Sequence, residues 1–437
     1  MKTTRTVLGC FCAALLLSQF VVPVRADDWP QWRGPNRDDV SKETGLLKTW
    51  PKDGPKLLWT FDKAGVGFSG SAVVGDRLYT MGGREDTSFV FALDVKTGKE
   101  LWACPIGKTY RNGYGDGPRG TPTVDGDSLY TLDGQGELIS VDVSTGKKRW
   151  SVNMTKDLHG EMMSGWGYSE SVLVDGDQVV CCPGGKDGTV AALDKKTGKV
   201  KWRSKELTDK ATYSSLVPAE ISGVRQYVQL THKESDEGAI VGVAAKDGKL
   251  LWYFSRKGYR TAVIPTPVVH GDLVYATAGY GAGCDLLQIS RTGEKFEAKE
   301  LYTKNSQKNA MKNQHGGVVL LGEYVYGYSD GPGWICQKLK TGESVWDDKV
   351  KVGRGSLTSA DGYLYCYAES TGEASLVAAN PKALDLKGKF KIPQETKIPR
   401  QAGRIWTHPV VANGCLYLRD QDLIFCYDVR SQMAAAR

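Results

Sequence analysis

The chain reads Phe91-Ala92-Leu93-Asp94-Val95-Lys96-Thr97-Gly98 followed by Trp102, and this pattern recurs. Close copies are Ile139-Ser140-Val141-Asp142-Val143-Ser144-Thr145-Gly146 with Trp150, and Ala191-Ala192-Leu193-Asp194-Lys195-Lys196-Thr197-Gly198 with Trp202. Looser copies end at Trp252 and Trp346. A period of about 50 residues is typical of stacked units that bury their apolar faces against one another. The repeat therefore predicts the fold before any other feature of the chain.

Each repeat predicts four short antiparallel strands. In the first copy they are residues 71–74, 78–80 and 89–94 and a fourth strand ending at Trp102. Gly75-Asp76 and Thr97-Gly98 fall between strands, where tight turns need residues that tolerate positive φ. Four such strands form one blade of a β-propeller.

Eight copies can be counted, the fourth of them degenerate between Ser215 and Trp252. The last copy stops near Arg430 after its third strand, whereas residues 55–61 look like an unpaired fourth strand. Pairing these two pieces would close the ring and remove exposed strand edges. We therefore expect an all-β, eight-bladed propeller of four-stranded antiparallel blades, closed by the N-terminal strand.

The repeated aspartate and tryptophan have structural roles in this interpretation. The Asp side chain can accept hydrogen bonds from backbone N–H groups of the adjoining turn. The Trp ring can be buried between neighbouring blades, with an indole N–H that needs a partner. Recurrence in most blades indicates architecture, because a catalytic group is needed only once.

The N-terminus is expected to be an export signal. Lys2 and Arg5 precede an apolar stretch at 7–22, and Val24-Arg25-Ala26 ends in a small residue before a polar start. The expected organisation is a signal peptide at 1–26, one propeller domain at 27–430 with a leader at 27–54 and a closing strand at 55–61, and a tail at 431–437. Leu8-Gly9-Cys10 weakly resembles a lipoprotein box, so lipid anchoring is the minor alternative to a soluble periplasmic or envelope-associated monomer.

Composition argues against several classes of function. Lys and Arg number 57 against 50 Asp and Glu, without a basic cluster, so we expect no nucleic-acid partner. The five histidines lack metal-ligand spacing, and no Cys-x-x-Cys-His haem motif occurs. No transmembrane segment and no metal site are expected.

The pattern Ala/Ser-x-Asp-x-x-Thr-Gly-x-x-x-Trp resembles the tryptophan-docking repeat of PQQ-type (quinoprotein-like) β-propellers. The start Trp29-Pro30-Gln31-Trp32-Arg33-Gly34-Pro35 resembles the leader of secreted bacterial members, and the resemblance covers nearly all of 27–430. Two classes share this architecture. Quinoprotein dehydrogenases bind pyrroloquinoline quinone (PQQ) and Ca²⁺ in the central funnel and oxidise alcohols or sugars, whereas BamB-type scaffolds act in outer-membrane protein assembly without a cofactor. The shared fold does not choose between them.

The candidate ligand site comes from the segments that precede each first strand, because the connecting loops at the mouth of the ring carry function. These segments supply a polar and aromatic set, namely Arg119, Trp166, Glu170, His315, Arg354, Arg404, Trp406 and His408. Arginines beside Trp166 or Trp406 could hold a flat anion such as PQQ. An ordinary solvated funnel, whose side chains pair with one another, would show the same residue types.

The features that the dehydrogenase resemblance implies are incomplete. No Asp, Asn or Glu set matches the Ca²⁺ and base positions of the dehydrogenases. Gly165-Trp166-Gly167 matches only part of their Trp-Gly-Trp-rich active-site segment. Some quinoprotein alcohol dehydrogenases carry a vicinal disulfide, but we expect Cys181 and Cys182 to be two ordinary buried cysteines, since neighbouring strand residues point to opposite faces.

We therefore expect a non-catalytic binding or scaffold protein, with no catalytic residue, that holds a protein, peptide or glycan at the funnel or rim. The alternative is a PQQ- and Ca²⁺-dependent dehydrogenase.

Overall fold

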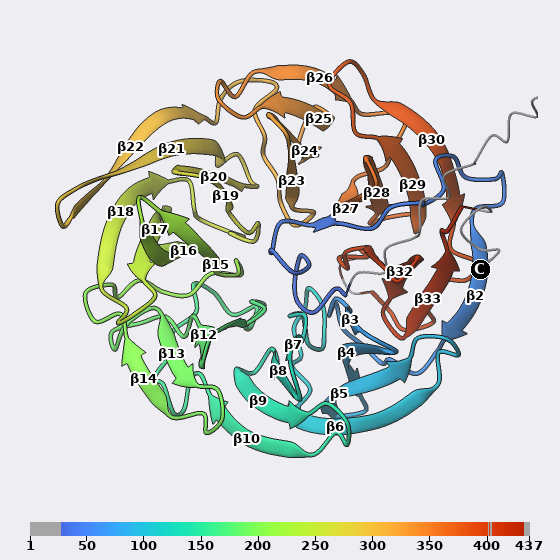
Figure 1. Cartoon of the computed structure of the whole chain (residues 1–437), viewed down its shortest axis with the longest axis horizontal. Coiled ribbons are helices and arrows are strands. Elements are labelled where there is room, and N and C mark those ends of the chain that lie inside the picture. The colour runs from blue at the N-terminus through green and yellow to red at the C-terminus, as the bar shows by residue number, and fades with distance from the viewer. Residues whose placement is uncertain (1–27, 401, 403, 432–437) are drawn as a thin grey trace, which may run out of the picture.

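The computed structural model describes residues 28–400, 402 and 404–431, and these form eight sheets arranged in a ring (Figure 1). Every regular element in this part of the chain is a β-strand. The predicted eight-bladed, all-β propeller is confirmed. The predicted signal peptide at 1–26 lies outside the described residues, as does most of the predicted tail.

The blades follow the chain, and we number them in that order. Blades 1 to 4 are β3 (Ala72–Val74), β4 (Arg77–Arg84), β5 (Thr87–Asp94), β6 (Glu100–Lys108); β7 (Thr123–Asp125), β8 (Ser128–Leu132), β9 (Glu137–Asp142), β10 (Lys148–Asn153); β11 (Leu173–Asp175), β12 (Gln178–Cys181), β13 (Ala191–Asp194), β14 (Val200–Arg203); β15 (Val217–Ile221), β16 (Val224–Glu234), β17 (Glu237–Ala244) and β18 (Leu250–Lys257). Blades 5 to 8 are β19 (Val268–His270), β20 (Leu273–Ala278), β21 (Gly283–Thr292), β22 (Lys295–Lys304); β23 (Val318–Leu321), β24 (Tyr324–Ser329), β25 (Gly333–Lys338), β26 (Ser344–Asp348); β27 (Gly355–Ala360), β28 (Tyr363–Ala368), β29 (Glu373–Ala378), β30 (Asp385–Lys391); β31 (Val410–Ala412), β32 (Cys415–Asp420), β33 (Leu423–Asp428) and β2 (Lys56–Phe61).

The N-terminal strand completes the last blade, as the sequence predicts. Strand β2 pairs antiparallel with β33, from Lys56 opposite Asp428 to Phe61 opposite Ile424. Trp59 then occupies the position held by Trp102 in blade 1, and its indole N–H donates to the carbonyl of Val95 at 2.8 Å. The ring is closed by hydrogen bonds between residues from opposite ends of the chain.

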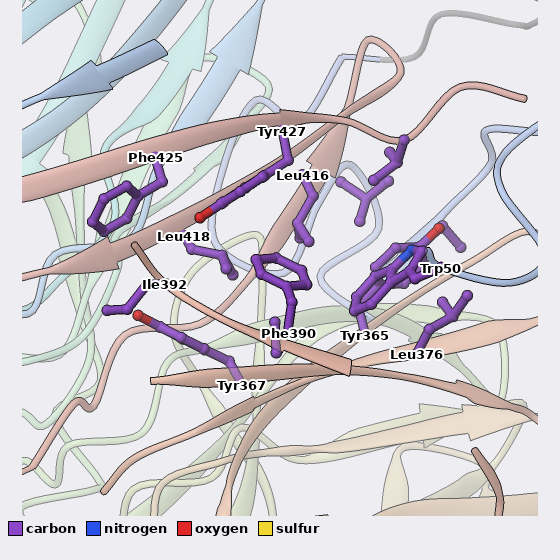
Figure 2. Packing of buried hydrophobic residues seen from close by; sticks show 14 of the residues in the cluster. Trp50, Tyr365, Tyr367, Leu376, Phe390, Ile392, Leu416, Leu418, Phe425 and Tyr427 are labelled. Atoms are coloured by element: carbon purple, nitrogen blue, oxygen red, sulfur yellow. The ribbon is translucent and has the colours of Figure 1, made fainter. Parts of the chain in front are cut away.

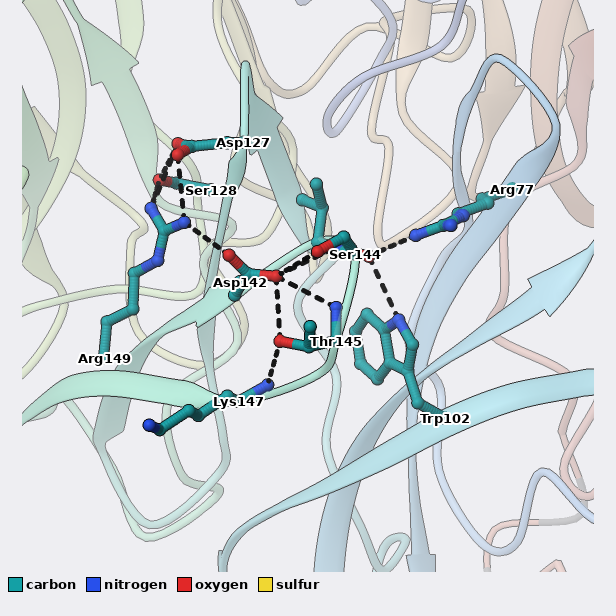
Figure 3. Close-up of polar contacts among 10 residues, drawn as sticks. Arg77, Trp102, Asp127, Ser128, Asp142, Ser144, Thr145, Lys147 and Arg149 are labelled. Carbon is teal, nitrogen blue, oxygen red and sulfur yellow. Dashed lines mark hydrogen bonds and ion pairs between the residues drawn. The ribbon is translucent and has the colours of Figure 1, made fainter.

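The turns that carry the repeated aspartate have the predicted local structure (Figure 3). In blade 2, Asp142 Oδ1 accepts hydrogen bonds from the backbone N–H groups of Ser144 and Thr145 and from both hydroxyl groups. Its other oxygen accepts from Arg149 at 2.7 Å. The aspartate therefore holds the turn that presents its glycine to the neighbouring blade.

The repeated tryptophan joins one blade to the next. The indole N–H of Trp102 in blade 1 donates to the Val143 carbonyl of blade 2 at 3.0 Å. The ring lies on Gly146, where an added Cβ would come within 2.7 Å of it. Since Gly146 also has a φ of 72°, both the space and the backbone conformation favour glycine there.

Most other seams between blades repeat or adapt this contact. Trp150 and Trp346 donate to the carbonyls of Lys195 and Asn380 in the next blade. In blade 5 a tyrosine takes the place of the tryptophan, and Tyr302 donates to the Leu339 carbonyl at 2.7 Å. Blade 4 departs from the pattern, because Trp252 donates to a side chain of its own blade.

The seam between blades 7 and 8 is built differently (Figure 2). Gly388 pairs with Leu376 where the other outer strands place an aromatic residue. Trp50, from the leader, fills this space and packs against Tyr365 and Phe390. An added Cβ on Gly388 would lie 2.6 Å from Cβ of Trp50, so the glycine admits the ring.

The leader crosses the middle of the ring, which the sequence did not predict (Figure 1). Its short strand β1 (Val40–Ser41) pairs in parallel with β27, so blade 7 has five strands and not four. Strand β6 also continues to Lys108, beyond the predicted end at Trp102. Among the described residues, no helix has the length and apolar character needed to cross a membrane.

Candidate ligand-binding pocket

A cavity of about 350 Å³ lies at one end of the propeller axis, and all eight blades contribute to its lining. Most of the lining residues come from the segments that lead into the innermost strands, which explains why one residue or a few per blade reach it. This is the mouth at which the sequence places the candidate site. The size is at the small end of ligand pockets, which span about 300–1,000 Å³.

Seven of the eight candidate residues line this one cavity. They are Arg119, Trp166, His315, Arg354, Arg404, Trp406 and His408. Glu170 does not line it. It is buried beside blade 3, where one carboxylate oxygen accepts the Cys182 N–H at 2.6 Å and burial raises its pKa to about 7. Glu170 therefore lies behind the wall of the pocket.

The charged side chains on one wall converge on Glu369. This carboxylate is only 1% exposed, and its Oε1 lies 3.2 Å from Arg354 and 3.1 Å from Arg404. Arg354 also lies 3.3 Å from Asp330. Burial raises the pKa of Glu369, while Arg354 and Arg404 act in the opposite direction and favour the carboxylate. The two arginines are thus largely neutralised within the wall.

Two histidines of the wall are neutral at physiological pH. Burial lowers the pKa of His408 to about 4 and the pKa of His315 well below its usual value. His315 lies 3.4 Å from Glu369 but, being uncharged, makes a dipolar contact and not an ion pair. The Nε2 of His408 lies 2.9 Å from the His315 carbonyl, which can only accept. This contact assigns the proton of His408 to Nε2 and leaves Nδ1 as an acceptor.

Aromatic rings form two groups around the cavity. Trp166 stacks on Tyr213 with ring centroids 5.7 Å apart and also contacts Tyr114 at 5.0 Å. Trp406 contacts Phe68 at 5.3 Å and the ring of His315 at 6.1 Å. These contacts fix the rings, so a ligand would meet a preformed surface.

Arg119 is the cation of the lining that lacks an acidic partner. Among the described residues, no carboxylate lies within ion-pair distance of its guanidinium group. It donates instead to the carbonyls of Gly117 and Gly115, and it lies over the ring of Tyr110 at 5.0 Å. Burial lowers its pKa. The group nevertheless stays cationic, because a free arginine has a pKa above 12.

The leader supplies the floor of the pocket. Trp32 lines the cavity, contacts the ring of His408 at 4.6 Å and donates to Thr266 Oγ1 at 2.9 Å. The next residue, Arg33, is buried and donates to the Val318 carbonyl at 2.7 Å. Its guanidinium group lies 3.1 Å from Asp39, also buried. The leader thus fills the axis beneath the cavity.

Sequence reasoning missed several lining residues. Trp32 escaped it because the leader precedes the repeat and gave no sign of entering the channel. Glu369 and Tyr280 lie between the second and third strands of blades 7 and 5. In a four-stranded antiparallel blade these loops emerge on the same face as the segments before the first strand. Both loop sets should therefore have been searched.

The sequence profile of the family described as outer membrane protein assembly factor BamB matches residues 86–348, more than half of the chain. The chain belongs to this family. A BamB of Burkholderia pseudomallei is 26% identical over 223 residues, which are 51% of this chain and 52% of that protein. The dehydrogenase subunit of a quinone alcohol dehydrogenase from Gluconacetobacter polyoxogenes is 34% identical over 164 residues, which are 34% of this chain and 21% of that protein. The chain spans about half or less of these relatives.

Among solved structures, BamB from Moraxella catarrhalis superposes with a TM-score of 0.57 at 14% identity. The match covers 86% of this chain and 99% of that chain. At this identity the likeness shows a shared fold. Relatives of both functional classes thus share the propeller, and the pocket has to distinguish them.

The pocket of this BamB-family propeller does not fit the PQQ and Ca²⁺ pair. Arg119 and the tryptophans suit a flat anion. A Ca²⁺ ion, however, needs six to eight oxygen ligands. Within the described ranges, Glu369 is the one carboxylate lining the cavity, and no group of three or more His, Cys, Asp or Glu side chains could hold a metal ion. Since Glu369 already faces two arginines, a cation would be repelled there.

The two adjacent cysteines lie away from the pocket. Cys181 ends strand β12, and both Cys181 and Cys182 are buried and unbridged in the core between blades 2 and 3. Burial raises the pKa of each thiol well above its usual value, which disfavours the reactive thiolate. Both behave as apolar core residues.

Proposed function

We propose that this BamB-family propeller is a non-catalytic binding or scaffold protein of the cell envelope, with the axial pocket as its ligand site. The observation that supports this most strongly is the pairing of Glu369 with Arg354 and Arg404. A catalytic base has to accept a proton from its substrate, and a carboxylate held by two guanidinium groups is a poor base. The pocket offers recognition groups, and its one carboxylate among the described residues is paired.

The second candidate is a PQQ-dependent dehydrogenase that oxidises an alcohol or a sugar. It is favoured by the similarity to the Gluconacetobacter polyoxogenes alcohol dehydrogenase subunit and by arginines beside two tryptophans in the pocket. In that case Arg119 would hold a carboxylate of the cofactor, which would supply the redox chemistry, whereas Arg354 and Arg404 are already paired with Glu369.

One titration separates the two candidates. The purified protein is titrated with PQQ and Ca²⁺ while tryptophan fluorescence is followed, and dye-linked oxidation of an alcohol and sugar panel is then measured. We expect no turnover above that of a buffer blank. Saturable binding together with turnover would overturn the proposal, and loss of both in Arg119→Gln would then assign the pocket to the cofactor.

Export is part of this proposal and needs its own test. If residues 1–26 are a signal peptide, the protein recovered from the envelope fraction begins at Asp27, which mass spectrometry of the intact protein measures directly. A chain with residues 2–26 deleted should remain in the cytoplasm. Recovery of the unprocessed chain from the cytoplasm would contradict export.

A further inference from the structure

The hydrogen-bonding groups that line the pocket define the ligand it can take, and this step rests on the proposed function. Donors exceed acceptors. Besides Arg119, Ser171 and Ser215 line the cavity, and the hydroxyl group of each already accepts one backbone N–H. Each hydroxyl therefore retains its own O–H as a donor. A donor-rich wall with one unneutralised cation favours a ligand that carries an anion.

The O–H donors that remain on Ser171 and Ser215 need acceptors from the ligand. The hydroxyl oxygens of a sugar can accept from both serines. An aromatic acid such as benzoate offers no acceptor besides the carboxylate that pairs with Arg119.

The shape of the pocket adds two constraints. Aromatic rings stand on its walls, and rings of this kind contact the flat C–H face of a sugar as well as they contact an aromatic ligand. The floor formed by Trp32 closes the cavity below, so a ligand has to be a free small molecule or the end of a chain. A volume of about 350 Å³ accommodates one or two sugar rings.

We propose that the axial pocket binds an acidic sugar, a pyranose that carries a carboxylate on its ring, as in a uronic acid. The carboxylate pairs with Arg119, and the sugar hydroxyl oxygens accept from the hydroxyl groups of Ser171 and Ser215. The pyranose ring packs against the aromatic side chains of the wall. This assignment provides a partner for the cation and for the two serine donors at once.

The test is isothermal titration calorimetry of the full chain with five probes: glucuronate, glucose, benzoate, digalacturonate and a short peptide with a free C-terminus. Glucuronate has 13 non-hydrogen atoms, and at about 0.3 kcal/mol per atom a dissociation constant on the order of 1 mM is expected. Glucose lacks the charged partner for Arg119 and should bind at least about tenfold more weakly. Benzoate should be weaker to a similar degree because it offers no hydroxyl oxygen to Ser171 and Ser215.

Matched variants locate the site. Arg119→Gln should abolish the preference for glucuronate over glucose. The control is Arg111→Gln, in the same loop, which removes an exposed guanidinium paired with Asp86 and Asp116 and should leave the preference unchanged. The comparison among probes uses the unaltered protein, so it still decides the proposal if Arg119→Gln does not fold.

Several outcomes would overturn the assignment. They are equal binding of glucose and glucuronate, equal or tighter binding of benzoate, displacement of glucuronate by a short peptide that binds more tightly through its free C-terminus, or no saturable binding of glucuronate and digalacturonate. None of these results bears on turnover with PQQ. The ligand assignment can therefore fail while the non-catalytic function stands, and turnover would remove that function whether or not the sugar binds.

Discussion

The seam between blades 1 and 2 and the seam between blades 7 and 8 solve the same packing problem with residues from different places. At the first, Trp102 meets the turn around Gly146, 44 positions along the chain, as the repeat dictates (Figure 3). At the second, Gly388 leaves a space and Trp50 of the leader fills it from far away in the sequence (Figure 2). The repeat thus builds local seams, and the seam beside the chain ends depends on the leader.

The largest expected effect is the loss of Trp50. Trp50→Ala removes a ring that is 7% exposed from a cluster shared by two blades and should lower the free energy of unfolding by about 3–5 kcal/mol. Trp102→Ala removes a half-buried ring and should cost less, about 2 kcal/mol. Urea denaturation followed by far-UV circular dichroism measures both.

The comparison would fail if Trp102→Ala were the more destabilising change. A leader that merely rests on a finished ring would give that result. Because β2 completes blade 8, the control is Leu57→Ala in β2, whose side chain is 38% exposed and should change the unfolding midpoint little.

The second effect tests the contact between ring and glycine. Gly146→Ala meets both a left-handed backbone, which costs about 1–2 kcal/mol, and a ring atom 2.7 Å from the new Cβ. Gly293 in blade 5 has a similar φ of 63° and nothing within 4 Å of an added Cβ. Gly293→Ala should therefore show the backbone cost alone, and Gly146→Ala should cost about 1–3 kcal/mol more.

The double variant Gly146→Ala/Trp102→Ala sharpens this second comparison. Removing the ring should relieve the clash, so the double variant should be more stable than the sum of the single effects predicts. Strict additivity, measured by the same denaturation, would mean that the ring moves aside at no cost.

The ring of eight blades could be predicted from the sequence because its signals are local. An Asp, a Thr-Gly turn and a Trp recur at nearly constant spacing, and each contacts the turn beside it or the next blade. The strand at 55–61 was recognisable because it carries a tryptophan like those of the other fourth strands, but no first three strands of a blade precede it. The leader could not be placed, since Trp32 and Trp50 interact with residues hundreds of positions away and belong to no repeat.

The pocket shows the same division. Seven residues on the segments before first strands were predicted together because the repeat fixes the position of each segment on the ring. The pairing of Glu369 with two arginines could not be predicted, since it joins a different kind of loop to two blades. Glu170 lies behind the pocket wall, where its carboxylate accepts the buried N–H of Cys182, 12 residues along the chain.

A third prediction concerns the indole nitrogens of the two seams. Trp102 donates to the Val143 carbonyl, whereas Nε1 of Trp50 is buried without a hydrogen-bond partner among the described residues. Phenylalanine removes the N–H and a similar part of the ring at both sites. We therefore expect Trp102→Phe to lower the free energy of unfolding by about 1 kcal/mol more than Trp50→Phe, once the loss of ring size common to both changes is subtracted. Urea denaturation measures both variants.

Arg77 limits how large this third effect can be. It also donates to the Val143 carbonyl, at 2.6 Å, so that acceptor keeps one partner in Trp102→Phe. The double variant with Arg77→Leu should raise the cost, because the carbonyl then loses both donors. Equal costs for the two phenylalanine variants would mean that the indole hydrogen bond contributes nothing to the seam.

The smallest expected effect is a difference in acid sensitivity between the turn at the seam of blades 1 and 2 and the turn at the seam of blades 6 and 7. Hydrogen bonds from Ser144 and Arg149 and from Thr145 hold the pKa of Asp142 well below its usual value. At the corresponding turn of blade 7, Asn380 Oδ1 accepts the N–H groups of Lys382 and Ala383 and cannot titrate in this range. A carboxyl whose pKa is lowered on folding stabilises the fold above its unfolded pKa of about 4, and this contribution is lost as the pH falls toward the folded value.

The sign of this effect can be reversed by exchanging the two side chains. In Asp142→Asn the stability difference from the unaltered protein should be present at pH 7 and shrink at low pH, while Asn380→Asp should introduce a new loss of stability on acidification. Asp127 shares Arg149, which lowers its pKa to about 2, so Asp127 is also protonated on acidification. Amide exchange of Ser144 and Thr145 against Lys382 and Ala383 reports each turn separately. If acid increased amide exchange equally at both turns of the unaltered protein, the whole propeller, and not the Asp142 carboxylate, would be responding to pH.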